Sequence, residues 1–272
     1  MKKELTLKEL QKESLKILKD VHQFCISNDI MYSVAYGTLI GTIRHKGFIP
    51  WDDDIDIIMP RPDYERFCRT YKSNRYKFKC HETDSKHLLA FGRVYDGQNT
   101  YIDTVIPWCN SDIGVWIDVF PIDNVSDDEK EFRKKHKVIQ KKWRKSVTAR
   151  AALGQFRLDR SFIFNFKLLI KKILYHNGSL ASGLIESVIN NKASLPFGQT
   201  KHWSQLSCLD GYEYHNIETF TSTQTFPFED TEVMVMNGYD SVLKECFGDY
   251  MKMPPKEEQI GHSDGLTKFY WK

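Results

Sequence analysis

The sequence predicts a protein of the α/β (α+β) class, with a β-sheet core flanked by helices. Residues 6–28 carry apolar side chains at helical spacing, which predicts a first helix that ends at Asn28. Residues 32–36 and 55–59 form short apolar segments typical of buried strands, and residues 114–123 form a longer one. Segments of both kinds therefore alternate along the first half of the chain.

The composition is that of an ordinary folded protein. The chain has 272 residues, of which 41% are apolar, so it can bury a sizeable core. Charged residues at Lys2, Lys3 and Glu4 leave no apolar stretch for a signal peptide, and no uncharged run reaches the roughly 18 residues of a membrane span. The six cysteines include no Cys-x-x-Cys pair, which favours a reduced, cytoplasmic protein without a zinc site.

The remaining elements of the first half follow from local signals. Pro60 to Asp63 predict the start of a helix with an apolar inner stripe. Alternation over residues 76–80 predicts a strand. Residues 88–95 and 100–102 are interpreted as a hairpin around a turn at Asp96-Gly97.

The most informative stretch joins a small-residue turn to a strand that begins with carboxylates. Glycine in Gly37-Thr38 lets the backbone approach a phosphate closely. Asp54 and Asp56 are two residues apart, so on a strand they face one way while Ile55 packs on the other side. Paired carboxylates repel each other unless a cation lies between them, and hard oxygen ligands suit Mg²⁺ or Mn²⁺. We therefore predict that Asp54 and Asp56 bind one of these ions.

This stretch resembles the LicD family, which includes phosphocholine transferases and the related fukutin-type proteins. The resemblance is carried by Gly37–Gly41, Arg44-His45 and Ile49–Asp56, a run of about twenty residues. It returns at residues 88–123, where Arg93 and Asn99-Thr100 match the family pattern, and again in the tail. The resemblance implies a nucleotidyltransferase-like mixed sheet core, with a helical basic insertion as the divergent part.

A second acidic position lies in the apolar strand at residues 114–123. Ile117 to Pro121 match the LicD pattern of Ile-Asp followed by an aromatic residue and proline. A carboxylate in an apolar strand needs a partner or a metal, and two-metal phosphoryl enzymes use a third carboxylate from a neighbouring strand. We predict Asp118 as this third metal ligand and catalytic residue, with Asp123 in a loop beyond Pro121. The alternative is that Asp118 pairs with an arginine for stability.

Further substrate-binding residues come from the same matched segments. They are predicted to be Gly37, Thr38, Arg44, Arg93 and Asp53. For Arg93 two interpretations stay open, a cation that faces phosphates and a surface residue on a half-exposed strand.

The net charge of +3 is unevenly distributed. Residues 130–172 carry 15 lysines and arginines against two acidic residues. Within this region, residues 161–175 are densely apolar with inserted lysines, which suits a helix at an anionic membrane surface. The alternative is a core helix with a solvated lysine face. No recognition motif supports nucleic-acid binding.

The second half of the chain gives weaker signals. Residues 179–190 are predicted to form a short helix, residues 198–211 a loop, residues 226–236 a strand and residues 239–248 a helix closed by Gly248. His202, Trp203 and His262 are considered for a substrate pocket. We divide the chain into a catalytic core (1–123), a basic helical insertion (124–200) and a C-terminal segment that completes the cleft (201–272).

The acids and the resemblance together predict a metal-dependent phosphotransferase. The family implies that phosphocholine moves from CDP-choline to a hydroxyl of a glycan or lipid-linked glycan, such as a teichoic-acid or lipopolysaccharide precursor. The alternatives are ribitol- or glycerol-phosphate transfer from a CDP-alditol, a true nucleotidyl transfer, and a non-catalytic membrane scaffold. Choline would need an aromatic cage, for which the available residues are Tyr36, Trp51, Trp108, Trp116 and Trp203. The expected location is the cytoplasm or the inner face of the plasma membrane.

Overall fold

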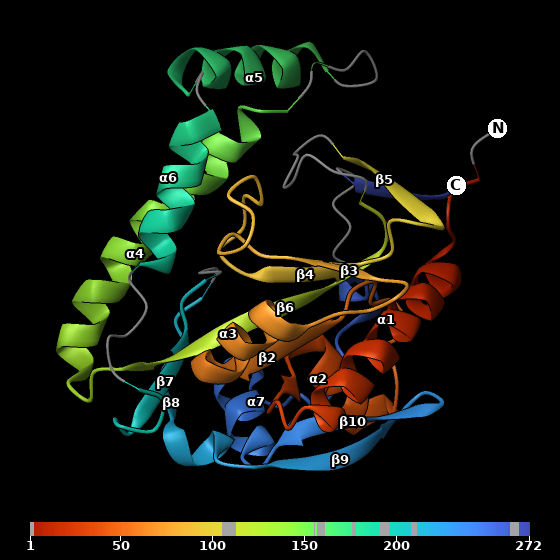
Figure 1. Ribbon diagram of the computed structural model, residues 1–272, viewed down its shortest axis with the longest axis vertical. Coiled ribbons are helices and arrows are strands. Elements are labelled where there is room, and N and C mark those ends of the chain that lie inside the picture. Colours follow the sequence, from red (N-terminus) through yellow and green to blue (C-terminus); the bar gives the residue numbers. More distant parts are fainter. Residues whose placement is uncertain are drawn as a thin grey trace.

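A computed structural model describes residues 3–104, 113–154, 156, 161–175, 178–190, 196–207, 211–261 and 267–272. Within these residues, seven strands form one mixed sheet, in which five follow the order β1-β2-β6-β4-β3. The other two strands extend the sheet, because β7 pairs with β6 and β8 pairs with β7. Its strands are β1 (Ser33–Val34), β2 (Asp56–Pro60), β3 (Lys77–Lys79), β4 (Gly92–Tyr95), β6 (Trp116–Val125), β7 (His202–Gln205) and β8 (His215–Asn216). The β2–β6 pair is parallel, and the other pairs are antiparallel. The predicted α/β class with a mixed sheet is confirmed (Figure 1).

The first helices cover this sheet. The predicted helix at residues 6–28 is α1, and a reciprocal capping box between Thr6 and Glu9 explains where it begins. Its inner face buries Ile17, Leu18 and Val21 completely. The helices near the sheet are α1 (Leu7–Ser27), α2 (Tyr36–His45), α3 (Arg61–Thr70) and α7 (Tyr239–Phe247), with short 3₁₀ turns at Ile217–Phe220 and Lys256–Glu258.

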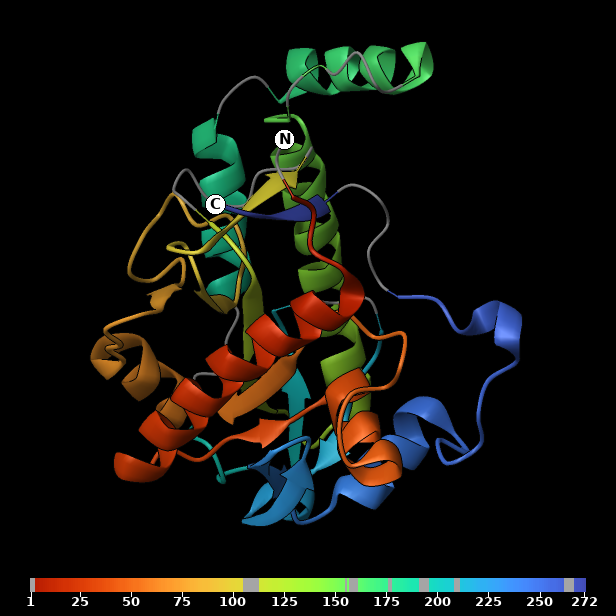
Figure 2. The ribbon, with the colours of Figure 1, turned by 90° about the vertical axis from the view of Figure 1, so that its right-hand side faces the viewer.

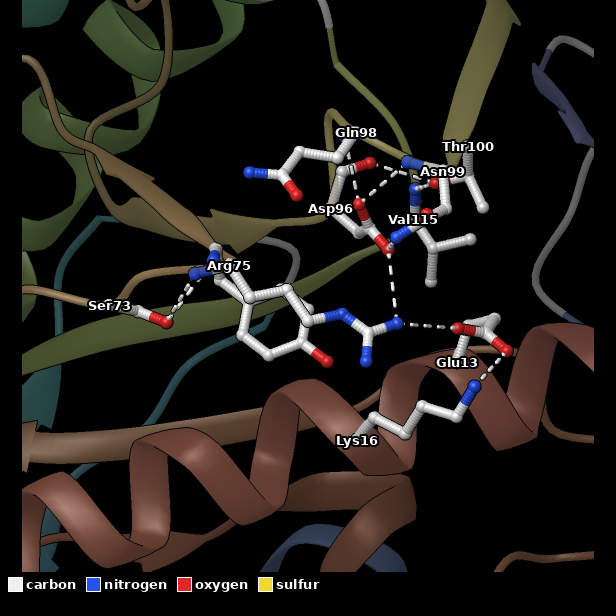
Figure 3. Close-up of polar contacts among 10 residues, drawn as sticks. Glu13, Lys16, Ser73, Arg75, Asp96, Gln98, Asn99, Thr100 and Val115 are labelled. Carbon is white, nitrogen blue, oxygen red and sulfur yellow. Dashed lines mark hydrogen bonds and ion pairs between the residues drawn. The ribbon is translucent and has the colours of Figure 1, made fainter. Parts of the chain in front are cut away.

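An ionic network ties α1 to the turn that follows β4. Figure 3 shows the Arg75 guanidinium between two carboxylates, 3.6 Å from Glu13 Oε2 and 3.7 Å from Asp96 Oδ2. Asp96 also accepts hydrogen bonds from the backbone nitrogens of Gln98 and Asn99. Burial raises the pKa of Asp96, but the hydrogen bonds from Asn99 and Gln98 outweigh it and leave the pKa below its ordinary value.

The predicted hairpin of residues 88–95 and 100–102 is wrong. Both sides of β4 are occupied, by β3 and by β6, so it has no edge left for the next strand. The turn instead directs β5 (Thr100–Thr104) away from the sheet, where it pairs with β11 (Thr267–Trp271) near the C-terminus. The hydroxyl of Thr100 fixes the turn by donating to the Asp96 carbonyl and accepting from the Val115 nitrogen.

Three further predictions about the strands are also wrong. Residues 198–211 were expected as a loop but contain β7, whose Trp203 is buried and donates to Thr219 instead of lining a pocket. Residues 226–236 form two strands, β9 (Thr223–Phe228) and β10 (Thr231–Met236), joined at Glu229 with a positive φ of 53°. Asp123 lies in β6 and not in a loop, because two hydrogen bonds from Arg61 satisfy its buried carboxylate.

Three helices form an arm that extends away from the sheet (Figures 1 and 2). This helical arm consists of α4 (Glu129–Ala151), α5 (Phe162–Leu174) and α6 (Gly178–Ile189), as the sequence predicts. The helices α4 and α6 pack along each other, and α5 lies across their far end. No helix of the described ranges is long and apolar enough to cross a membrane. The divisions at residues 123 and 200 stay a prediction.

Candidate active site

A cavity of about 560 Å³ opens where the mixed sheet meets α2 and the C-terminal segments. Its lining includes acidic side chains, Arg93 and several aromatic side chains. The lining residues include Tyr36, Gly37, Trp51, Asp52, Asp54, Asp56, Phe91, Arg93, Asp118, Phe120, Gln205, Glu213 and Phe247. We call the charged lining residues Asp52, Asp54, Asp56, Arg93 and Asp118 the floor, and the aromatic lining residues Tyr36, Phe91, Phe120 and Phe247 the wall.

The parallel pair of strands brings the acids together. Asp56 is the first residue of β2 and lies directly opposite Asp118 in β6. The backbone nitrogen of Asp118 donates to the Ile55 carbonyl at 2.9 Å, which extends this pairing by one residue. Ile55 and Ile57 are fully buried, as expected for side chains that alternate with Asp54 and Asp56. The structure thus places Asp54, Asp56 and Asp118 in one cavity.

Arg93 supplies the positive charge on the neighbouring strand. It lies opposite Asp118 in the β4–β6 pairing and donates through Nε at 2.5 Å and through Nη2 at 3.2 Å to the Asp118 carboxylate. Its guanidinium also stacks on Trp116, 4.2 Å from the ring centroid. The alternative interpretation of Asp118 as an arginine-paired acid is therefore observed, and the pair lies inside the cavity beside Asp56.

Burial and mutual repulsion both disfavour negative charge at the floor. Burial of its carboxyl group is the largest cause that raises the pKa of Asp56 well above its ordinary value. The negative charges of Asp54, Asp118 and Asp52 add to this effect, and Arg93 opposes it. A cation brought near Asp56 would relieve this repulsion.

The chemistry of these donors fits a hard divalent ion, but their arrangement is incomplete. Carboxylate oxygens are the ligands that Mg²⁺ and Mn²⁺ prefer. Within the described residues, no three acidic, histidine or cysteine side chains are grouped so that they could hold an ion. The bidentate contact with Arg93 engages both oxygens of Asp118. Asp54 and Asp56 are therefore the better-fitting donors, and the assignment of all three acids as ligands stays a prediction.

The Gly37-Thr38 turn positions the acids. Both residues lie in the first turn of α2, and Thr38 is buried, with its hydroxyl accepting a hydrogen bond from the Asp56 nitrogen at 2.9 Å. Gly37 lines the cavity, and a Cβ there would lie 2.6 Å from Asp52 Oδ2. Thr38 therefore fixes the start of β2, and Gly37 makes room for Asp52.

Three predicted substrate-binding residues, Thr38, Arg44 and Asp53, do not line the cavity. Arg44 ends α2 and donates to the carbonyls of Tyr250 and Lys252, so it holds the C-terminal segment against α2. Asp53 is half-buried beside the acids that line the cavity. Of the residues considered for a substrate pocket or a choline cage, His262 and Trp108 lie outside the described residues. The ring face of Trp116 is covered by the Arg93 guanidinium.

Several lining residues were not predicted. Asp52 belongs to the matched aspartate run, and its burial distinguishes it from Asp53. Gln205 comes from the region interpreted as a loop, Glu213 lies just beyond it where no element was predicted, and Phe247 ends α7. No local signal identifies these three, because only the tertiary fold brings them to β2 and β6.

The fold and the cavity define an α/β protein whose paired strands carry an acidic site suited to a hard cation. Residues 29–154 match the family model described as LicD/FKTN/FKRP, nucleotidyltransferase domain. The chain is 31% identical to the lipopolysaccharide cholinephosphotransferase LicD of Haemophilus influenzae, over 96% of this chain and 97% of that protein. An uncharacterized protein of Rickettsia prowazekii is 49% identical over 41 residues, 15% of either chain. The chain belongs to the LicD family, and the prediction that it is a transferase of this family is confirmed.

Proposed function

We propose that the protein transfers phosphocholine from CDP-choline to a hydroxyl of a lipopolysaccharide or teichoic-acid precursor. The observation that carries this proposal is the opposition of Asp56 and Asp118 on parallel strands, with Asp54 beside them in one cavity. The name of the Haemophilus relative, which matches nearly the whole chain, supports choline as the transferred group.

The side chains of the floor divide the work of such a transfer. Asp54 and Asp56 would hold Mg²⁺ or Mn²⁺, which when bound neutralises charge on the departing CMP. Arg93 adds positive charge beside the phosphate, and its two hydrogen bonds fix the direction of the Asp118 carboxylate. Asp118 accepts the proton of the acceptor hydroxyl as that oxygen attacks phosphorus.

The alternative donor is a CDP-alditol. An alditol would be recognised through its hydroxyls, and Gln205 and Asp52 offer polar groups in the cavity lining. A scaffold without turnover is the remaining alternative. CMP release from different CDP-linked donors separates choline transfer, alditol transfer and a scaffold without turnover.

We expect CMP release from CDP-choline when the protein is incubated with Mg²⁺ and a glycan acceptor. Chelation by EDTA should abolish it, and added Mg²⁺ or Mn²⁺ should restore it, because two of the floor acids need the ion to hold a diphosphate. Chromatography measures the CMP released from CDP-choline, CDP-ribitol and CDP-glycerol, with each donor supplied at the same concentration. Release from an alditol donor alone would replace the choline assignment, and no release from any CDP donor would favour a scaffold.

We also propose that α5 rests on an anionic membrane surface at the inner face of the plasma membrane. One side of α5 exposes large apolar residues, namely Phe162, Ile163, Phe166, Leu169, Ile170, Ile173 and Leu174. Leu168 is buried on the opposite side, toward the rest of the helical arm. Lys167, Lys171 and Lys172 flank the apolar side, so the helix has the composition of an interfacial anchor.

Charge reversal on α5 tests this membrane proposal. Substitution of Lys167, Lys171 and Lys172 by glutamate should weaken binding to phosphatidylserine-containing vesicles by about a hundredfold or more, because each lysine contributes about 1 kcal/mol near such a surface. Vesicle sedimentation measures the bound fraction. The matched control reverses three exposed lysines outside the helical arm, Lys8, Lys12 and Lys72, and should change binding little. Equal partitioning of all variants would remove the proposal.

A further inference from the structure

Glu213 brings a further carboxylate to the cavity lining from a segment outside β2 and β6. Its side chain is 17% exposed, and its Oε1 accepts a hydrogen bond from the Tyr36 hydroxyl at 3.1 Å. On its other side, Oε2 lies 3.8 Å from Nε2 of His215. Glu213 is therefore held by two contacts while it borders the cavity.

The charges around Glu213 leave an excess of negative charge. His215 Nδ1 lies 2.6 Å from Glu245 Oε2, so one imidazole lies between two carboxylates. Burial lowers the pKa of His215, but interactions with Cys246, Glu213 and Glu245 outweigh it and raise the pKa to about 10. A protonated His215 balances one of the two acids. The remaining negative charge favours a cation in the cavity.

Aromatic rings continue the wall from Glu213 toward the floor. The rings of Tyr36 and Phe120 meet edge to face with their centroids 6.1 Å apart, and the ring centroids of Phe120 and Phe91 lie 4.4 Å apart. The Arg93 guanidinium lies 5.7 Å from the Phe91 centroid and pairs with Asp118. The wall therefore leads from Glu213 to the acids that would hold the phosphates. Trp51 and Phe247 also line the cavity.

The backbone of Tyr36 is held in an unfavourable conformation. Its φ is 49°, although it is a bulky residue at the first position of α2. Such backbone strain persists only where surrounding contacts impose it, and it gathers at binding and catalytic sites. Here the strained residue presents its ring to Phe120 and its hydroxyl to Glu213.

We infer that Glu213 and the aromatic wall of Tyr36, Phe120, Phe91 and Phe247 form the subsite for a quaternary ammonium group. This inference rests on the proposed function in one respect, since it places the choline end of the donor. A quaternary ammonium has no N–H to donate, so it is recognised by ring faces and by carboxylate charge. The two-carbon link of choline would then run along the wall from Glu213 to the phosphate at the floor.

The experiment uses choline chloride alone as the probe and the full chain as the receptor. Calorimetric titration should show choline binding to the wild-type protein and no binding of glycerol. Glu213→Gln should weaken choline binding about tenfold, since it removes the negative charge that faces the ammonium. The matched control is Glu218→Gln, the same chemical change at an exposed residue that does not line the cavity. It should bind choline as the wild type does.

A second variant guards against a folding defect. Phe247 is 46% exposed, so Phe247→Ala should leave the melting temperature nearly unchanged while it weakens choline binding severalfold. Wild-type protein that does not bind choline, or variants that bind it with unchanged affinity, would overturn the subsite. Choline binding without CMP release from CDP-choline would leave the subsite in place and reject the proposed transfer.

Discussion

Replacing Asp56 by asparagine is expected to abolish CMP release while the melting temperature stays equal or rises by a few degrees. Turnover should fall on the order of 10³-fold, because the amide lacks the negative charge with which Asp56 would hold the metal ion. Stability should not fall, because Asp54, Asp118 and Asp52 all repel the Asp56 carboxylate in the protein. Steady-state kinetics and thermal denaturation, run on the same preparation, measure both effects. The same divergence is expected for Asp54→Asn.

A matched control separates this effect from a general loss of acidic charge. Asp230→Asn changes an exposed carboxylate in the β9–β10 turn, and its turnover should equal that of the wild type. A large drop in the melting temperature of Asp56→Asn would mean that the acids of the floor are structural. Normal turnover of this variant would remove Asp56 from the chemistry.

Replacing Arg93 by methionine should have the largest effect on stability. The Arg93 side chain is 12% exposed and makes two hydrogen bonds to Asp118, whose side chain is equally buried. Removal of the guanidinium leaves a buried carboxylate without its partner, which should cost about 3–5 kcal/mol in the free energy of unfolding. Arg93→Lys keeps the charge but loses the planar fork, so its loss should be smaller. Urea denaturation measures both.

A double variant tests whether the stability loss in Arg93→Met comes from the unpaired charge of Asp118. Adding Asp118→Asn to Arg93→Met should recover part of the lost stability, because the unpaired charge is gone. CMP release should be absent in the double variant, because it also lacks the Asp118 carboxylate. Turnover in this variant would show that neither Arg93 nor Asp118 takes part in the chemistry.

The local parts of the fold could be predicted because their causes are local. The capping box of Thr6 and Glu9 marks the start of α1, and Gly248 with φ 65° marks the end of α7. The alternation of Asp54, Ile55 and Asp56 placed both acids at one cavity. Each of these signals lies within a few residues of the feature it predicts.

The errors concern pairing between distant segments. The partner of β5 is β11, about 165 residues away, so the nearby β4 was a wrong choice. The β9–β10 turn places Glu229, not glycine, at a positive φ, and thus carries no turn signal in the sequence. Glu213 is 177 residues from Tyr36, and no pattern in either segment announces their contact. The sequence therefore predicted the acidic residues of the site, whereas the contribution of Glu213 became visible only in the structure.

With α5 on a membrane as proposed, the length of α4 would set the distance between the cavity and the membrane surface. Arg133, near the start of α4, stacks on Tyr212 next to Glu213, whereas α5 packs against α4 and lies across the far end of the arm (Figure 1). At 1.5 Å per helical residue, the stretch between them spans roughly 25–30 Å. A headgroup at the bilayer would not reach the aspartates across that gap. An acceptor sugar several units away from its lipid anchor would reach them. The helical arm would therefore favour extended glycans as acceptors.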